Sequence, residues 1–430
     1  MKKTIWSDYI GKDYPKLNED IKTEILIIGG GISGILCAYF LSMAGKKCVV
    51  CEADRICNKK TLKTTATITA LQDVMYYKLV ETMGVNKAKM YYEANIFALS
   101  EYKKLADKFD FDFEECPSYK YDETTDYELK KEYNILKMFN ADVFLVSDIG
   151  LPIKVFKALK MDDQGQMNPL KLVNCLSENL VIYEKTSIKS LDKNIAYTEN
   201  NKIEFNDVVV CTGYPFLKVK GLFPFKLHQK KSHVVAVENN NGYVGNGIGT
   251  KDSDIYFRNY QDYLVFGSND MKTGYSVDGF ESINKFIVKN YNIGKKIFRW
   301  INEDTVTLDE IPYIGRYTKN SKNMYVCTGY NLWGMTASMI AANLITDLIC
   351  GKENKYEELF SPSRKIVFKP MLENIKTAVK GLVSFNKKRC SHLGCGLHYN
   401  SCDETYECRC HGSKYDKDGN IIETPAQNKI

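Results

Sequence analysis

The sequence predicts an α/β domain built on a parallel sheet, an α+β domain interleaved with it, and a small all-β subdomain at the C-terminal end. Three observations predict this arrangement. An apolar run leads into closely spaced glycines near residue 29, helix-like and strand-like segments interrupt the first domain, and cysteine and histidine concentrate after residue 389. The 430 residues, 44% of them hydrophobic, suffice for two or three domains.

Charge and composition exclude several classes of protein. The 59 basic and 53 acidic residues are mixed along the chain, and no basic block carries interleaved aromatic residues, so we expect no nucleic-acid partner. Residues 25–45 are apolar, but their glycines and flanking lysines favour a strand, a loop and a helix over a membrane span. The nine cysteines before residue 380 are scattered, which favours the cytoplasm.

Gly29, Gly31 and Gly34 follow the first apolar run with the spacing of a dinucleotide-binding loop. The first permits a tight turn, the second lets the backbone approach a pyrophosphate, and the third lets a helix, expected over 32–44, pack closely on the strand. Glu52 ends the next apolar strand, where a carboxylate can accept hydrogen bonds from both ribose hydroxyls. It would repel a 2′-phosphate, so NADP is disfavoured, and NAD and FAD remain.

Four later segments, 181–191, 207–216, 307–317 and 324–351, resemble the FAD-dependent amine oxidoreductases of the D-amino-acid oxidase and glycine oxidase superfamily. Together with the glycine loop, they spread the resemblance over roughly residues 20–365. It implies an FAD-binding, Rossmann-like fold, with the N-terminus of a helix after residue 334 facing the flavin. The further FAD-binding residues that it implies are Thr64, Thr65, Ile188, Cys211, Thr212, Gly213, Gly329, Gly334, Met335 and Thr336.

The chain departs from that family at two places. Lys59 and Leu62 stand where relatives usually have glycines before the threonine pair near the flavin, so the local flavin geometry is expected to differ. Asn168 stands where relatives more often carry histidine. No histidine is therefore expected there for general base work or covalent attachment of the flavin.

The resemblance also implies the chemistry. Hydride leaves the carbon next to nitrogen for the flavin, while the protein supplies orientation and a dry pocket. The implied substrate is a small amine or amino acid, and Arg258 and Arg316 are candidates for holding its carboxylate, although such arginines are more often surface or salt-bridge residues. Tyr256, Tyr260 and Trp333 are candidates for the pocket wall, with a core role as the alternative.

The expected domain boundaries follow these landmarks. The FAD-binding part takes the first, third and fifth stretches of the chain, and the substrate part takes the two between them. The boundaries are 1–75, 150–215 and 300–365 for the FAD part, 76–149 and 216–299 for the substrate part, 366–388 for a linker with a possible short helix, and 389–430 for the C-terminal module.

The C-terminal module contains two short motifs, Cys390-x-His392 and Cys408-x-x-His411. Two thiolates and two imidazoles can hold zinc in a tetrahedron. They can equally hold a 2Fe–2S cluster of the Rieske type, with sulfur ligands on one iron and nitrogen ligands on the other. A knot of disulfides is the third reading.

The neighbouring residues favour the cluster, because "CSHLGC" and "CRCHGSKY" resemble both boxes of Rieske proteins. The resemblance assigns Cys390 and Cys408 to one iron and the two histidines to the other. It implies a disulfide between Cys395 and Cys410. It further implies hydrogen bonds from Ser413 and Tyr415 to cluster and cysteine sulfur. His398 and Cys402 are then bystanders.

Flavin and cluster on one chain predict a redox enzyme that passes electrons singly through the cluster to an external acceptor, either a small redox protein or a quinone-type molecule. One alternative is a redox-sensing protein without turnover, and another is a flavin oxidase stapled by zinc. Only residues 371–389 precede the first box, where a full Rieske domain has a basal sheet. We therefore expect the module to lean on the flavin domain for its missing core.

Overall fold

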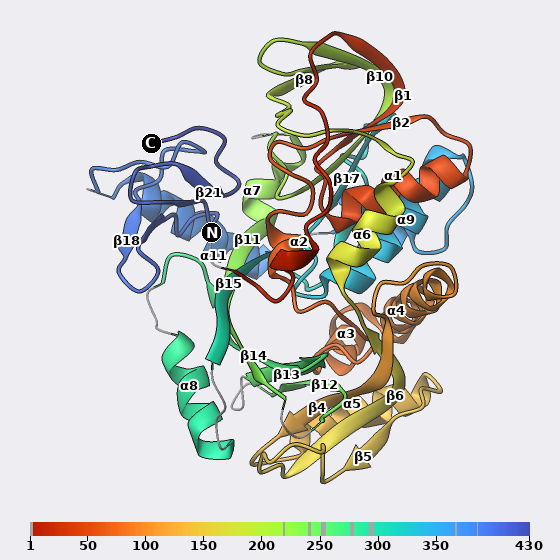
Figure 1. The fold of residues 1–430 in the computed structure, drawn as a ribbon, viewed down its shortest axis with the longest axis vertical. Helices are drawn as coiled ribbons and strands as arrows, with labels where there is room; N and C mark the ends of the chain where they lie inside the picture. The colour runs from red at the N-terminus through yellow and green to blue at the C-terminus, as the bar shows by residue number, and fades with distance from the viewer. Residues whose placement is uncertain are drawn as a thin grey trace.

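The architecture is drawn in Figure 1, a computed structural model of the chain. Two large sheets and a small C-terminal sheet form its framework. The structure describes residues 3–217, 220–239, 242–250, 255–275, 279–291, 296–365, 368–384 and 386–430.

The first sheet has eight strands in the order β16-β17-β10-β1-β2-β7, with β9 beside β10 and β8 beside β9. Its central strands run parallel, and residues 25–28 of β1 are buried on both faces, which explains their unbroken apolar run. Helices α1 and α9 pack against each other on this sheet (Figure 1). The bounds are β1 (Ile21–Ile28), α1 (Ile32–Met43), β2 (Cys48–Cys51), β7 (Val181–Tyr183), β8 (Ser190–Asp192), β9 (Ile195–Tyr197), β10 (Lys202–Gly213), β16 (Tyr313–Arg316), β17 (Met324–Thr328) and α9 (Gly334–Ile349).

The second sheet has nine strands in the order β15-β11-β14-β13-β12-β4-β6-β3, with β5 beside β6. This sheet includes β3, β6 and β15. Most residues of these three strands lie within the stretches that the sequence predicts for the FAD part. The bounds are β3 (Thr67–Ile68), β4 (Glu114–Asp122), β5 (Phe144–Val146), β6 (Lys157–Gln166), β11 (Leu227–Glu238), β12 (Asn246–Gly249), β13 (Ile255–Tyr260), β14 (Tyr263–Lys272) and β15 (Lys296–Thr307).

Helices connect and cover these sheets, and the stretch expected to be helical from the spacing of its apolar residues forms α3 and α4. No helix in the described ranges is long and apolar enough to cross a membrane. The bounds are α2 (Lys60–Lys63), α3 (Tyr76–Met83), α4 (Val85–Ala106), α5 (Tyr127–Met138), α6 (Pro169–Ser177), α7 (Phe223–Lys226), α8 (Gly279–Asn290), α10 (Glu357–Phe360) and α11 (Phe368–Leu382).

The C-terminal module is a four-stranded antiparallel sheet, β18-β19-β20-β21, with α11 packed beside it. Helix α11 occupies most of the stretch expected to be a linker. Gly381 brings it close to the module, since a Cβ added there would lie 2.3 Å from the sulfur of Cys410. The strands are β18 (His398–Asn400), β19 (Thr405–Glu407), β20 (Lys414–Tyr415) and β21 (Ile421–Glu423).

A buried network of ion pairs joins this module to the nine-stranded sheet. Lys231 of β11 contacts Asp403 at 2.7 Å and Glu407 at 3.1 Å. Lys414 of the module contacts Glu303 of β15 at 3.1 Å. All five side chains are at most 5% exposed. The module therefore shares its interior with the body of the protein, as its short length predicts.

Candidate functional site

The glycine loop opens onto a cavity of about 310 Å³, which we call the first cavity. It lies at the carboxyl ends of β1, β10 and β17, the edge at which parallel sheets bind nucleotides. The predicted FAD-binding residues that line it are Gly29, Gly31, Glu52, Thr64, Ile188, Cys211, Thr212, Gly213, Gly329, Gly334 and Met335.

The loop has the backbone geometry that its glycines predict. Gly29 has a φ of 108°, in the region that favours glycine. A Cβ at Gly34 would lie 1.9 Å from the carbonyl oxygen of Gly29, so only glycine lets α1 pack this closely. Glu52 accepts a hydrogen bond from the amide of Gly30 at 2.7 Å, and burial raises its pKa. The cradle fits a dinucleotide.

Three of the predicted FAD-binding residues, and also Asn168, lie beside the first cavity rather than on its wall. Gly34 supports the loop from beneath, and Thr65 lines a neighbouring cavity. The hydroxyl of Thr336 accepts a hydrogen bond from Gln72 at 2.9 Å. Asn168, which replaces the relatives' histidine, begins α6 by accepting from the amide of Leu170 at 3.1 Å. It is therefore a helix cap.

The departure from the family at Lys59 and Leu62 falls at α2, where Lys59 precedes the helix and Leu62 is buried within it. Two lysines of this helix pair with distant parts of the protein. Lys60 donates to Gln229 at 3.1 Å and to Thr305 at 3.0 Å, both on the nine-stranded sheet. Lys63 pairs with Glu423 of the C-terminal module at 2.6 Å. Glu423 and the four residues after it line the first cavity. The C-terminal module thus forms part of the wall of the first cavity, and Lys63 links it to α2.

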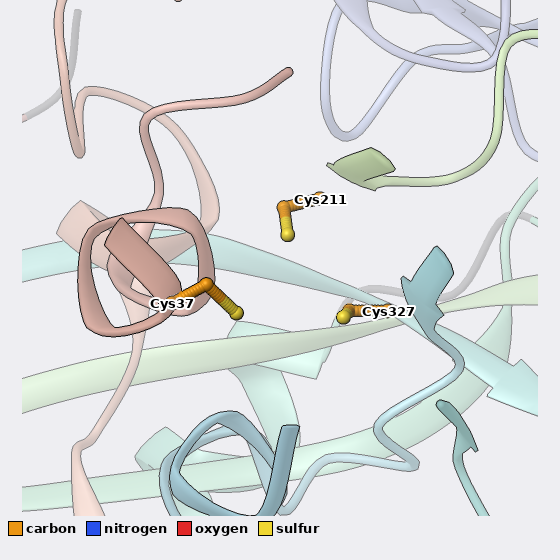
Figure 2. Close-up of side chains that lie close together, drawn as sticks. All are labelled: Cys37, Cys211 and Cys327. Carbon is orange, nitrogen blue, oxygen red and sulfur yellow. The ribbon is translucent and has the colours of Figure 1, made fainter. Parts of the chain in front are cut away.

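Three thiols gather between α1 and the first sheet, as Figure 2 shows, and two of them, Cys211 and Cys327, line the first cavity. Cys37 of α1, Cys211 of β10 and Cys327 of β17 place their sulfur atoms within 4.8 Å of one another. All three are buried, and burial raises the pKa of Cys327 well above its usual range. They fill the space between the helix and the strands as small apolar side chains.

A second cavity of about 300 Å³ adjoins the first, and Thr64, Asn302, Asp304, Gly334 and Met335 are among the residues that line both. The candidates Trp333 and Tyr256 lie on its wall. Sequence reasoning missed its other polar residues, because no motif marks them. These include His228, Lys230, Ser232, Asn246 and Asp304.

Neither candidate arginine lines this cavity. Arg258 is 1% exposed, and its guanidinium donates to the backbone carbonyls of Ala66 and Met167, both at 3.2 Å. Arg316 donates to the carbonyl of Lys322. Their positions lend no support to a role in binding substrate. Tyr260 likewise bonds Asp112, at 2.7 Å.

The two cysteine–histidine motifs form matching loops. The amide of Gly394 donates to the carbonyl of Cys390 at 2.9 Å, and that of Gly412 donates to Cys408 at 2.8 Å. Both glycines have positive φ, 79° and 84°. The imidazole rings of the two histidines lie 5.0 Å apart between centroids. The four predicted ligands, Cys390, His392, Cys408 and His411, are each at most 3% exposed.

The donor set fits a metal centre of mixed sulfur and nitrogen ligation. Nδ1 of His411 is buried without a hydrogen-bond partner among the described residues, as a coordinating nitrogen would be. Burial and the neighbouring His392 lower the pKa of His411 to about 3, so its imidazole is neutral and able to bind metal. Its ring also hydrogen-bonds the backbone of Pro224, outside the module.

The residues predicted to tune the cluster surround these loops. The hydroxyl of Tyr415 donates to the sulfur of Cys390 at 3.4 Å. Ser413 is fully buried, and its hydroxyl accepts from the amide of Ala426 at 3.2 Å. Cys395 and Cys410 are free thiols with their sulfur atoms within 4.8 Å. Their disulfide stays a prediction.

Tyr214 connects the two sites. It follows the Cys211-Thr212-Gly213 turn, lines the first cavity and is fully buried. Its ring lies 6.1 Å from that of His392 and 6.4 Å from that of His411, measured between centroids. One aromatic side chain therefore touches the cavity on one side and both imidazoles on the other.

Comparison with protein families agrees with this geometry. Residues 24–348 match the family described as "FAD dependent oxidoreductase". The chain belongs to this family. Residues 372–430 match the "Rieske [2Fe-2S] domain", a match that begins within α11. The protein is thus an FAD-dependent oxidoreductase with a C-terminal Rieske domain, and its cofactors are FAD and a 2Fe–2S cluster.

One relative matches nearly the whole chain, and solved structures match its larger part. The chain is 29% identical to the Bacillus subtilis protein YhfW, which is named as a Rieske 2Fe-2S iron-sulfur protein, over 96% of this chain and 94% of that one. Glycine oxidase from Geobacillus kaustophilus aligns with a TM-score of 0.68 at 16% identity, over 80% of this chain and all of its own. L-proline dehydrogenase from P. horikoshii gives 0.68 at 17% identity, over 81% and 98%. These two structures share the fold.

Proposed function

We propose that this FAD-dependent oxidoreductase oxidises the C–N bond of a small amine or amino acid, and that its Rieske cluster passes the electrons singly to an external acceptor. FAD supplies the two-electron chemistry, and the cluster supplies one-electron chemistry. The ligands proposed for the two irons are Cys390 with Cys408 and His392 with His411. The observation that carries the proposal is the position of Tyr214 between the first cavity and both imidazoles.

The second cavity is the proposed substrate site. Lys230 provides a cation that can pair with a carboxylate, in place of the two arginines. His228 lies two residues earlier on the same face of β11, and burial lowers its pKa to about 3. Its Nδ1 is buried without a partner among the described residues. A neutral imidazole there can accept a hydrogen bond from the substrate amine.

Aromatic and apolar residues that line this cavity favour a substrate with an apolar part. Trp333 and Tyr256 provide aromatic surface, and Met335 begins α9 where the two cavities meet. Asp304 lies at the same junction. Burial raises its pKa, and the positive charge of Lys60 offsets only part of that rise. These side chains orient a small molecule and exclude water from the reacting carbon. The two structural neighbours, a glycine oxidase and an L-proline dehydrogenase, are named for the oxidation of amino acids.

A panel of amines and amino acids tests this proposal. Each compound is mixed with the full-length holoprotein without oxygen, and flavin absorbance is followed by stopped flow. We expect bleaching with at least one compound that carries hydrogen on a carbon next to nitrogen. Failure of every compound, with FAD and iron fully loaded, favours the alternative of a redox-sensing protein without turnover.

The variant Lys230→Met tests whether the enzyme recognises a carboxylate on its substrate. We expect KM for an amino-acid substrate to rise by about tenfold or more, because an ion pair to the carboxylate is worth about 1.5–3 kcal/mol in such a site. The corresponding amine without a carboxylate should be oxidised with an unchanged KM. Steady-state kinetics on both compounds measures the difference, and equal effects on the two would remove Lys230 from the substrate site.

Tyr214→Ala should uncouple the two centres. The variant removes the ring that fills the space between the first cavity and the imidazoles, so electron transfer from flavin to cluster should slow severalfold, while FAD and iron content persist. Tyr214→Phe is the matched control, because the hydroxyl has no hydrogen-bond partner among the described residues. Single-turnover absorbance resolves the two steps. Equal rates in all three proteins would exclude a path through Tyr214.

A further inference from the structure

Helix α11 packs its small and polar residues against the Rieske module. The carbonyls of Thr377 and Ala378 lie 3.7 and 3.9 Å from the sulfur of Cys410, whereas the buried Asn374 accepts a hydrogen bond from Lys272 of β14 at 3.2 Å. Gly381 packs even closer to that sulfur. At Thr377, Ala378 and Gly381 the helix thus approaches the cluster loops closely.

Two large aliphatic residues of α11, Leu372 and Val379, and Val383 just after the helix instead face outward, whereas Ile375 is half-buried. Leu372, Val379 and Val383 follow the spacing of one helical stripe and are 39%, 53% and 69% exposed. Leu382 and Leu393 are 48% and 38% exposed and lie close together, since Arg389 bonds the carbonyls of Leu382 and Gly394. A surface helix of a globular domain normally shows the opposite arrangement. We name the outward aliphatic residues the α11 face: Leu372, Val379, Leu382, Val383 and Leu393.

The charge around the α11 face is strongly positive. Residues 372–393 contain five basic side chains and one acidic side chain. Lys380 lies on α11 one position after Val379, and Lys387 and Lys388 follow the helix, all three exposed. A second copy of the same face would meet like charges, which disfavours self-association through it.

We propose that the α11 face binds the surface of an anionic lipid bilayer. Aliphatic side chains enter the boundary between headgroups and acyl chains, while the lysines beside them pair with lipid phosphates. Each such lysine strengthens attraction to an anionic surface, so binding should weaken as salt screens the charges. Since no described helix can span a bilayer, the attachment is peripheral. The proposed attachment is inferred from the exposure and charge of the α11 face, and it is a property separate from the proposed oxidation chemistry.

Under the proposed function, attachment to a bilayer would bring the cluster close to an electron acceptor dissolved in the lipid. The histidine side of the cluster site is closed by Tyr214 and by the backbone of Pro224. An acceptor therefore approaches from another side, and Cys395 and Cys410 lie directly beneath α11. Binding through α11 places this side of the module at the bilayer, where a lipid-dissolved acceptor is accessible.

Vesicle flotation with the full-length holoprotein tests the inference. We expect binding to vesicles of phosphatidylcholine with phosphatidylglycerol, weak binding to phosphatidylcholine alone, and weakening by salt. The double variant Val379→Ser/Val383→Ser should bind about tenfold more weakly, because it loses aliphatic burial. Val288→Ser is the matched control, since Val288 on α8 is 67% exposed and lies outside the α11 face.

Three outcomes would overturn the inference. The first is absence of binding to anionic vesicles by protein that carries FAD and two irons. The second is a dimer in sedimentation that Val379→Ser/Val383→Ser dissociates, which would identify a second copy as the occupant. The third is equal binding by the control and the double variant. Substrate bleaching of the flavin is measured on the same samples, so failure of the lipid interaction is distinguished from failure of the proposed oxidation.

Discussion

Lys231→Met is expected to destabilise the docked Rieske module by about 3–5 kcal/mol, the usual effect of removing one partner from a buried ion pair. The lysine is fully buried between Asp403 and Glu407, so the variant leaves two carboxylates short of a counter-charge in a site closed to water. Lys414, 3.3 Å from Glu407, compensates only in part. The thermal unfolding midpoint and the iron content after mild heating measure the loss.

Two controls separate this effect from a general loss of charge. Lys285→Met breaks an exposed pair with Glu281 at 2.7 Å and should leave the thermal unfolding midpoint nearly unchanged, because solvent screens this pair. Lys231→Met combined with Glu407→Gln should recover part of the loss, because the uncompensated carboxylate is removed as well. If Lys231→Met and Lys285→Met behave alike, the buried network does not hold the module in place.

Gly34→Ala should reduce bound FAD about tenfold or more, because even one methyl group cannot be accommodated at this position. The new Cβ would lie 1.9 Å from the carbonyl oxygen of Gly29, and a backbone atom cannot move away as a flexible side chain can. Helix α1 must then separate from β1, and the pyrophosphate loses its cradle. Flavin released by heat from the purified variant, counted per chain, gives the result.

Gly45→Ala is the control for Gly34→Ala, since Gly45 has a φ of 80° and no atom within 4 Å of an added Cβ. It carries only backbone strain of about 1–2 kcal/mol and should keep its FAD. Two irons per chain in Gly34→Ala would show that the Rieske module still folds. Full retention of FAD by Gly34→Ala would contradict the packing described for the loop.

The glycine loop and the ligand boxes could be predicted from sequence because each is a local pattern with a fixed mechanical reason. Gly29 and Gly34 act on neighbouring backbone, and the two cysteine–histidine loops each close on a single glycine. The FAD fold and the Rieske domain that these patterns predict are confirmed by the family matches. The ligand assignments themselves stay predictions.

Other features depend on contacts that no local pattern records. Lys63 pairs with Glu423, 360 residues later, so this lysine finds its partner only once the module is docked. Tyr214 follows a recognisable turn, yet its contact with both histidines requires the module to arrive from the far end of the chain. The charge of Arg258 makes it a candidate for binding a substrate carboxylate, whereas in the structure its guanidinium donates to backbone carbonyls.

Freeze-quench EPR tests the central claim most directly, namely that one chain transfers electrons from substrate through FAD to the cluster. Holoprotein is mixed without oxygen with a compound that bleaches the flavin, and samples are frozen over the time course of bleaching. We expect the rhombic signal of a reduced Rieske cluster to grow within the same time course, in protein that contains one FAD and two irons per chain. Complete bleaching with a cluster that stays oxidised would contradict the account.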